Sequence, residues 1–248
     1  MNILVIPCFN EAARIDLSYW KQIIKSSKTT NFNFIFIDDG SKDNTFELIN
    51  KLSKYSCVEV MHLKSNVGKA NAIRFAFCEI LTRSNIACEF IGFIDSDSAF
   101  DSQEVIEALS SLNESIFDND AVFYSRVKLS GSQIKRSEIR HVISRIIYTY
   151  IARGWFWAPY DTQCGFKIFR NSFFLSDVVS VPFKTRWFFD IEFIAKLAIA
   201  RGSKLKIKEI PLRYWQERSG SRIKKSHYFS ILLEIILARK LVKSISIF

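Results

Sequence analysis

The amino-acid sequence predicts an α/β fold in which a mostly parallel central sheet is flanked by helices. Short apolar segments of strand length alternate with helical patterns through the first 115 residues, an order typical of parallel sheets with right-handed crossovers. Three of the strand-like segments end in acidic or amide side chains. Ligands of open α/β sheets bind beyond the carboxyl ends of the strands. The same pattern therefore predicts where a functional site lies.

The first half of the chain alternates between strand and helix. Five apolar segments read as strands, namely Asn2–Phe9, Asn33–Ile37, Cys57–Leu63, Phe90–Ile94 and Ala121–Val127. Helical patterns between them reach Ile24, begin near Asp43 and Asn44, cover Gly68–Arg83, and extend from Asp101 to Leu112. Glu47 follows Asn44 at the spacing of a capping box, so we expect the second helix to be capped there.

The segment Phe90–Ile94 carries no charge and reads as a strand buried on both faces. It stops at Asp95-Ser96-Asp97, two carboxylates separated by one serine, a sequence that is also ordinary for a polar turn. Two other strands end in Asn10-Glu11 and Asp38-Asp39. Because the carboxyl ends of parallel strands share one edge, we expect these three polar ends to converge.

The pattern changes after residue 127. We expect a helix over Ser137–Arg153, a polar loop Asp161–Lys167 leading into a strand-like Ile168-Phe169, a helix Phe188–Arg201 ending at Gly202, a strand Lys204–Tyr214, and an amphipathic helix Tyr228–Ile247. The 248 residues, with 48% hydrophobic side chains, suffice for one large core. We expect a single domain with a first part (1–127), a second part (128–227) and a C-terminal helix (228–248).

The five cysteines are scattered, form no Cys-x-x-Cys pair and have no histidine nearby in the sequence, which excludes an ordinary zinc site. They read as reduced thiols of a cytoplasmic protein, and Cys164 reads as a packing residue. The N-terminus lacks the features of a secretory signal. No uncharged apolar run of about 18 residues exists, so no transmembrane segment is expected.

The net charge of +10 indicates an anionic partner, which can be nucleic acid, a phosphorylated molecule or an anionic membrane face. The excess of basic residues comes from Arg126–Arg153 and from Arg201–Lys243. The C-terminal half is therefore the basic half.

Several motifs in order resemble the family-two glycosyltransferases of GT-A fold: Ile6–Glu11, Asp38–Thr45, Asn66–Ala70 and Asp95–Asp97. The motifs in the second half of the chain look like those of the dolichyl-phosphate glucosyltransferases, with the dolichyl-phosphate mannosyltransferases as near relatives. These motifs are Tyr124–Arg126, Arg136–Arg140, Asp161–Lys167, Arg186–Glu192 and Gly220–Ile223. The chain departs from them in beginning directly at a strand, where the eukaryotic members carry a membrane anchor, and in having Arg222 where lysine is common.

The resemblance implies a nucleotide diphosphate sugar as donor, UDP-glucose or GDP-mannose. It makes residues 1–127 the nucleotide-sugar-binding part and residues 128–227 the acceptor-binding part. It places Asp39 on the base and Pro7, Asn10 and Glu11 around base and ribose. Lys69 follows Gly68 at a helix start, where backbone amides and an ammonium group can meet a phosphate; the alternative is a solvated lysine. Gln163 and Lys167 look like sugar or phosphate contacts near the metal.

Two carboxylates beside a diphosphate would repel it by roughly 3 kcal/mol for each pair, at about 5 Å and an effective dielectric constant near 20. A divalent cation, Mg²⁺ or Mn²⁺, removes this cost and is bound by oxygen ligands. We therefore expect Asp97 to hold a metal and to be catalytic, because the metal offsets charge on the departing nucleotide. Asp95 reaches the metal directly or through water, or contacts the ribose.

The expected acceptor is a polyprenyl phosphate. Guanidinium groups hold phosphate bidentately, and Arg126, Arg136 and Arg140 are the candidates; the alternative is a solvated basic helix face. A phosphomonoester is already anionic at pH 7, so Asp190 need not act as a general base, whereas with a hydroxyl acceptor it would be the first candidate. We count Arg126 and Asp190 with Asp97 as catalytic.

The sequence thus favours inverting transfer of a hexose, glucose before mannose, to a polyprenyl phosphate. One alternative keeps the fold and donor but uses a soluble or glycan hydroxyl acceptor, as in cell-surface polysaccharide synthesis. A nucleic-acid-binding module leaves the acidic strand ends unexplained, so we expect no nucleic acid partner. The basic residues of the C-terminal segment, Lys224, Lys225, Arg239, Lys240 and Lys243, fit peripheral contact with the cytosolic face of a membrane; the alternative is a helix packed on the sheet.

Overall fold

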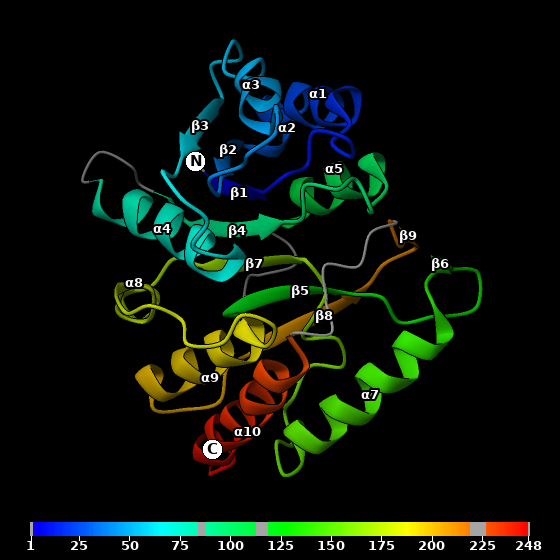
Figure 1. The fold of residues 1–248 in the computed structure, drawn as a ribbon, viewed down its shortest axis with the longest axis vertical. Coiled ribbons are helices and arrows are strands. Elements are labelled where there is room, and N and C mark those ends of the chain that lie inside the picture. Colours follow the sequence, from blue (N-terminus) through cyan, green and yellow to red (C-terminus); the bar gives the residue numbers. More distant parts are fainter. Residues whose placement is uncertain (1, 84–87, 113–118, 219–226, 248) are drawn as a thin grey trace.

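The computed structural model describes residues 2–83, 88–112, 119–218 and 227–247. A seven-stranded sheet with the order β3-β2-β1-β4-β7-β5-β8 forms its centre (Figure 1). Its strands are β1 (Asn2–Cys8), β2 (Phe32–Asp38), β3 (Val58–His62), β4 (Phe90–Ile94), β5 (Ala121–Ser125), β7 (Phe166–Arg170) and β8 (Ile207–Pro211). All neighbours pair in parallel except β7, which is antiparallel to β4 and β5. The prediction of a mostly parallel α/β sheet is confirmed.

The antiparallel direction of β7 positions the loop that precedes it. Phe166, the first residue of β7, lies opposite Ile94, the last residue of β4. The amide of Asp95 then donates a hydrogen bond to the carbonyl of Gly165 (3.0 Å). A loop that is distant in sequence therefore reaches the acidic end of β4.

Helices cover both faces of the sheet (Figure 1). One face packs against α1 (Leu17–Lys25), α3 (Thr45–Asn50) and α5 (Ser102–Ser110), next to the short α2 (Ser27–Thr30). The other packs against α4 (Lys69–Thr82), α8 (Phe173–Ser180), α9 (Phe189–Arg201) and α10 (Tyr228–Ile245). The strands are apolar on both sides because both faces are covered.

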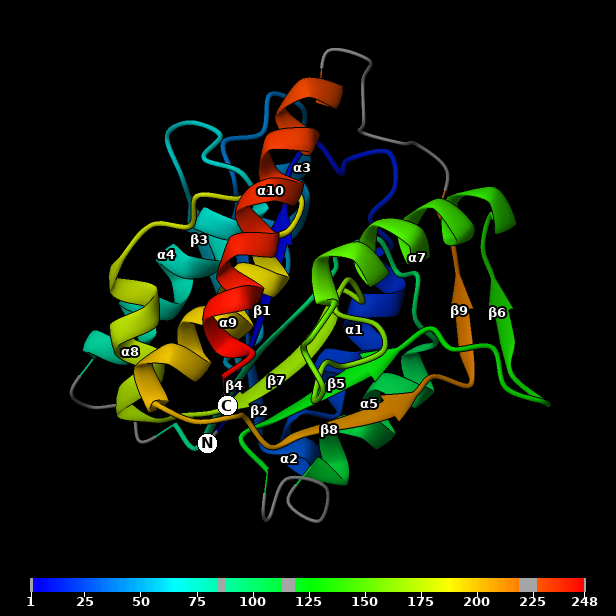
Figure 2. The same ribbon diagram turned by 90° about the horizontal axis from the view of Figure 1, so that it is seen from below.

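Helix α7 (Glu138–Ala152) and a two-stranded sheet of β6 (Gln133–Lys135) and β9 (Tyr214–Gln216) lie beyond the last strands of the central sheet (Figure 2). Helix α10 packs against both α9 and α7. The guanidinium of Arg239 donates to the carbonyls of Ile151 (3.2 Å) and Arg153 (2.5 Å) at the end of α7. The C-terminal helix is thus attached to the part of the chain that carries the predicted acceptor arginines.

Three details of the prediction were wrong. Asp43 and Asn44 were both expected to cap α3, but the side chain of Asn44, the N-cap residue, makes no capping hydrogen bond, and Asp43 accepts one from the amide of Thr45 (3.1 Å). The single strand expected over Lys204–Tyr214 is two, β8 and β9, which pair in different sheets. The fifth strand ends at Ser125, before Val127. Helix α8 and strand β6 were not predicted. The motif residues Gly220–Ile223, including Arg222, and the predicted membrane contacts Lys224 and Lys225 lie outside the described residues.

Candidate active site

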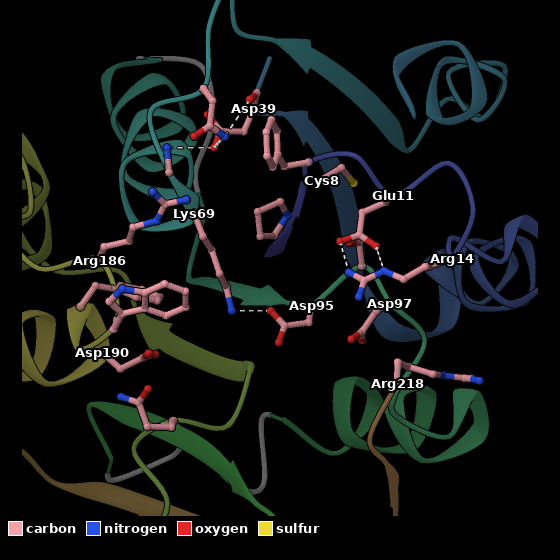
Figure 3. A pocket seen from close by; sticks show the side chains of 18 of the residues that line it. Cys8, Glu11, Arg14, Asp39, Lys69, Asp95, Asp97, Arg186, Asp190 and Arg218 are labelled. Atoms are coloured by element: carbon pink, nitrogen blue, oxygen red, sulfur yellow. Dashed lines mark hydrogen bonds and ion pairs between the residues drawn. The ribbon is translucent and has the colours of Figure 1, made fainter. Parts of the chain in front are cut away.

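A cavity of about 380 Å³ lies at the carboxyl ends of β1, β2 and β4 (Figure 3). Nine of the predicted site residues line it: Pro7, Glu11, Asp39, Lys69, Asp95, Asp97, Arg140, Gln163 and Asp190. The three polar strand ends therefore meet, as expected. Residues after 127 also line the cavity, so the first half of the chain does not form it alone.

Asp97 is surrounded by negative charge. Its Oδ1 accepts a hydrogen bond from the amide of Ala99 (3.2 Å). Burial, followed by the charges of Asp95 and Glu11, raises the pKa of Asp97 to about 6. A carboxylate in this environment is stabilised by a nearby cation. The position of Asp97 therefore fits a divalent metal.

The protein would supply few of the metal's ligands. In the described parts of the chain, no three His, Cys, Asp or Glu side chains form a group that could hold a metal ion. Asp95 and Asp97 are the two carboxylates that directly follow β4, and Asp95 forms an ion pair with the ammonium of Lys69. A divalent cation here would complete its coordination with diphosphate oxygens and water, as Mg²⁺ commonly does.

Lys69 and Gly165 position Asp95. Burial lowers the pKa of Lys69, but the carboxylates of Asp95 and Asp190 outweigh burial and hold this pKa above its ordinary value. A Cβ atom at Gly165 would overlap the carboxyl group of Asp95. Glycine at this position leaves the space that the Asp95 side chain occupies.

Asp39 lines the cavity and also holds its wall. Its carboxylate accepts hydrogen bonds from the amides of Val67 (2.7 Å) and Gly68 (2.9 Å) and from Nδ2 of Asn66 (2.7 Å). Burial raises its pKa. Asp39 therefore fixes the loop that leads into α4 and Lys69, and its contact with the base stays a prediction.

Glu11 forms a two-point ion pair with Arg14, with distances of 2.8 Å to Nε and 2.5 Å to Nη2 (Figure 3). Asn10 does not line the cavity. It adopts a left-handed conformation (φ 49°), and its Oδ1 accepts a hydrogen bond from the amide of Lys42 (2.9 Å). Asn10 thus joins the turns after β1 and β2 to each other.

Lys167 lies beneath the cavity rather than on its surface. Its side chain is 1% exposed, and its Nζ lies 2.6 Å from Oδ1 of Asp190. The ammonium also donates to the carbonyl of Cys164. A direct contact with phosphate or sugar was expected, but the geometry makes Lys167 the counter-ion of Asp190. Burial raises the pKa of the Cys164 thiol to about 12, in agreement with packing.

Arg126 is bound by Asp161. Its Nε and Nη2 lie 2.8 Å from the two carboxylate oxygens, and its amide donates to Oδ2 (3.0 Å). Burial alone would raise the pKa of Asp161, but the Arg126 guanidinium holds this pKa well below its usual range. The guanidinium carbon also lies 5.1 Å from the ring centre of Trp215.

The three predicted acceptor arginines line a second pocket of about 210 Å³. Arg140, Gln163 and Glu217 line both this pocket and the first cavity. Arg136 precedes α7, whose N-cap is Ser137, so it does not share a helix face with Arg140 as expected. Both arginines nevertheless reach the same pocket.

Several cavity residues were not identified from the sequence: Arg14, Arg186, Trp187, Glu217 and Arg218. Arg14 has a local signal, since it lies three residues after Glu11. Arg186 and Trp187 belong to a motif that was noted, but no local pattern indicates that this loop faces β4. Arg218 donates to the carbonyl of Ser98 (2.7 Å), a contact across 120 residues.

Comparison with known proteins identifies the family. The model of the family described as "Glycosyl transferase family 2" matches residues 3–176, more than half of the chain. The chain belongs to glycosyl transferase family 2. The dolichyl-phosphate beta-glucosyltransferase of Saccharomyces cerevisiae is 30% identical over 238 residues, which cover 89% of this chain and 68% of the yeast protein.

Solved structures show the same fold for this family-two member. The glucosyl-3-phosphoglycerate synthase of Mycobacterium tuberculosis in complex with UDP aligns with a TM-score of 0.63 at 16% identity, over 99% of this chain and 80% of the synthase chain. A mannosyltransferase of Pyrobaculum calidifontis in complex with GDP-Man and Mn²⁺ aligns with a TM-score of 0.57 at 15% identity, over 96% and 62% of the two chains. The fold is GT-A.

Proposed function

We propose that this glycosyltransferase moves a hexose, glucose in preference to mannose, from a nucleotide diphosphate sugar to the phosphate of a polyprenyl lipid, with inversion at the sugar. The likeness to dolichyl-phosphate beta-glucosyltransferases over most of the chain supports this acceptor class. One observation carries the proposal. The acidic cavity suited to the donor adjoins an arginine-lined pocket, and the two have Arg140, Gln163 and Glu217 in common.

Asp97 and Asp95 are the proposed holders of Mg²⁺ or Mn²⁺ on the donor side. The bound metal would offset the negative charge that develops on the departing nucleotide diphosphate. The Mn²⁺ in the mannosyltransferase complex of the same fold supports this choice of ion. Asp39, Pro7 and Glu11 line the end of the cavity in which the base and ribose are proposed to bind.

Arg136 and its neighbours suit an anionic acceptor. Arg136 donates to Nε2 of His141 (2.9 Å), and an imidazole ring brings no negative charge to the pair. Burial and the nearby charge of Arg126 lower the pKa of Arg136. Four arginines and two carboxylates line the second pocket, so the net charge of its lining favours an anion such as a phosphate: Arg126, Arg136, Arg140 and Arg145, against Asp161 and Glu217.

The proposed acceptor removes the need for a general base. A phosphomonoester is already anionic at pH 7, whereas a hydroxyl would have to lose its proton. Asp190 is held by Lys167 at the floor of the cavity. In this proposal its carboxylate orients the sugar hydroxyl groups.

Two helices present apolar faces toward solvent. On α7 these are Ile139, Val142, Ile143, Ile146 and Tyr150, and on α10 they are Tyr228, Phe229, Leu232, Leu233 and Ile236. Each set recurs at three- and four-residue steps, so it forms one stripe along its helix. No helix of the described residues has both the length and the apolar content to cross a bilayer. We assign both stripes, with the exposed Lys240 and Lys243 of α10, to peripheral contact with an anionic membrane that holds the lipid acceptor.

The test incubates the purified protein and Mn²⁺ or Mg²⁺ with UDP-glucose or GDP-mannose, with and without polyprenyl phosphate. We expect a β-linked lipid phosphate sugar, with UDP-glucose as the better donor. Transfer to the lipid phosphate from neither donor would overturn the proposal, and transfer to a hydroxyl acceptor instead would favour the alternative. Asp97→Ala should abolish turnover, whereas Asp177→Ala, at an exposed position of α8, should not.

Arg136→Ala tests the acceptor pocket separately. We expect the KM for polyprenyl phosphate to rise at least about tenfold, since a charge-assisted hydrogen bond contributes about 1.5–3 kcal/mol, while the KM for the donor stays near its wild-type value. Lys135→Ala is the matched control, because Lys135 is exposed on β6 next to Arg136. An unchanged acceptor KM in Arg136→Ala would exclude this arginine from phosphate binding.

A further inference from the structure

Glu234 of α10 binds the backbone of a loop that walls the donor cavity. Its Oε2 accepts hydrogen bonds from the amides of Arg186 (2.9 Å), Trp187 (2.7 Å) and Phe188 (3.4 Å). Arg186 and Trp187 line the cavity, and Arg186 lies on the side of Lys69 and Asp39 (Figure 3). Phe188 is the N-cap of α9 and makes no side-chain capping hydrogen bond.

The carboxylate of Glu234 binds the backbone just before α9, whose first turn carries its own acidic residues, Asp190 and Glu192. The first amides of a helix have no partner within the helix, and Glu234 accepts from that of the N-cap, Phe188, 46 positions away in the sequence. Negative charge near this end of a helix is favourable because of the helix dipole. The conformation of the Arg186-Trp187 wall is therefore fixed from another helix.

A second contact joins the same two elements. The ring of His227, the N-cap of α10, lies 5.7 Å from the ring of Trp187 between centroids. The guanidinium carbon of Arg186 in turn lies 5.8 Å from the centre of the Trp187 ring. Both cavity residues are thus connected to α10, through the backbone by Glu234 and through the aromatic ring by His227.

The side of this loop that lines the cavity affects the charge of the proposed donor site. The positive charge of Arg186 acts on the carboxylate of Asp39, where it opposes the rise in the pKa of Asp39. Asp39 belongs to the proposed base-binding end of the cavity. A loop that shifts Arg186 would therefore change the charge that an incoming nucleotide meets.

We infer that Glu234 is a positioning residue for nucleotide binding: it holds Arg186 and Trp187 against the donor cavity from helix α10. This deepens the proposed function and rests on it for the identity of the ligand. At 100° per residue, Glu234 lies nearly opposite the apolar stripe of α10. The same helix therefore presents one side to solvent and holds the cavity wall with the other.

The experiment titrates UDP and GDP, each with Mg²⁺, into the intact protein by calorimetry. For Glu234→Ala we expect the Kd of the bound nucleotide to rise about tenfold, as for loss of hydrogen bonds to a charged acceptor. Glu234→Gln should lie between wild type and Glu234→Ala, because the amide oxygen still accepts. Glu79→Gln, which neutralises an exposed carboxylate of α4, should bind as wild type does.

A double-mutant cycle separates positioning from a general loss of structure. If Glu234 acts through the wall, then in a chain carrying Arg186→Ala and Trp187→Ala the further change Glu234→Ala should alter the Kd by less than about threefold. The inference would be overturned if Glu234→Ala raised the Kd by the same factor in this chain as in the wild type. Wild-type affinity in Glu234→Ala would overturn it too. Should Glu234→Ala fail to fold in thermal unfolding, Glu234→Gln replaces it in both comparisons.

This test is independent of the acceptor. Nucleotide binding is measured without polyprenyl phosphate, so absence of lipid transfer would overturn the proposed function and leave this inference standing. Conversely, normal nucleotide affinity in both Glu234 variants would overturn this inference while leaving lipid transfer possible.

Discussion

Replacing Asp97 by asparagine should change stability and activity in opposite directions. The pKa of Asp97 is raised from 3.8 to about 6 by burial and by the neighbouring Asp95 and Glu11. Without a metal, ionising this carboxyl group in the folded protein therefore costs more than in the unfolded chain. An asparagine side chain carries no charge at any pH, so Asp97→Asn should stabilise the metal-free fold while it abolishes transfer.

The size of the gain in stability follows from the shift in the pKa of Asp97. A difference of about two pKa units corresponds to at most about 3 kcal/mol at pH 8. For a chain of this length, that is an increase in Tm of at most about 10 °C. Because the folded-state pKa is the raised one, the wild type keeps its full stability below the unfolded value of 3.8 and loses it as the pH rises through about 6. The advantage of Asp97→Asn should therefore disappear at pH 4.

The assay is thermal unfolding in a chelator at pH 8 and at pH 4, with Asp177→Asn as the control for loss of one exposed carboxylate. Added Mg²⁺ should raise the Tm of the wild type, since a ligand that binds the native state stabilises it, and should leave Asp97→Asn unchanged. An equal or lower Tm for Asp97→Asn at pH 8 would refute the reasoning. So would an advantage of the same size at both pH values.

Two further substitutions test buried and close-packed parts of the site. Asp161→Asn leaves the partly buried Arg126 without its counter-ion and should destabilise the fold by at most about 3–5 kcal/mol in urea unfolding. Glu59→Gln opens a more exposed ion pair and should cost less than about 1 kcal/mol. Equal costs would contradict this assignment. Gly165→Ala should lower kcat about a hundredfold by displacing the carboxyl group of Asp95, and wild-type turnover would show that Asp95 tolerates the displacement.

The parts of the fold that depend on local pattern were predictable. The uncharged run Phe90–Ile94 has to be buried, and its acidic end has to leave the sheet at the edge where β1 and β2 also end. The direction of β7 was not predictable, because Phe166–Arg170 is an apolar segment whichever way it runs. Its direction depends on where the chain returns after α7, which no local signal encodes.

The same distinction holds for the site. The acidic residues were found because they follow strands, and strands are recognisable. Their partners were not found. Lys167 was expected to contact the donor, yet it neutralises Asp190 from below, and the counter-ion of Arg126 lies 35 residues away at Asp161. Such pairs form between loops from distant parts of the chain, and only the assembled sheet brings them together.

The three acceptor arginines are not equivalent once their partners are known. Arg126 has a two-point carboxylate partner in Asp161, and Arg140 has a single ion-pair contact with Glu217 at 2.5 Å. A phosphate that approaches either of them must compete with a carboxylate already in place. Arg136 instead donates to His141, so its charge is the least compensated of the three. Under the proposed function we expect Arg126 and Asp161 mainly to fix the shape of the pocket and Arg136 to contribute most of the attraction for the acceptor phosphate. Arg140 lines both the pocket and the donor cavity.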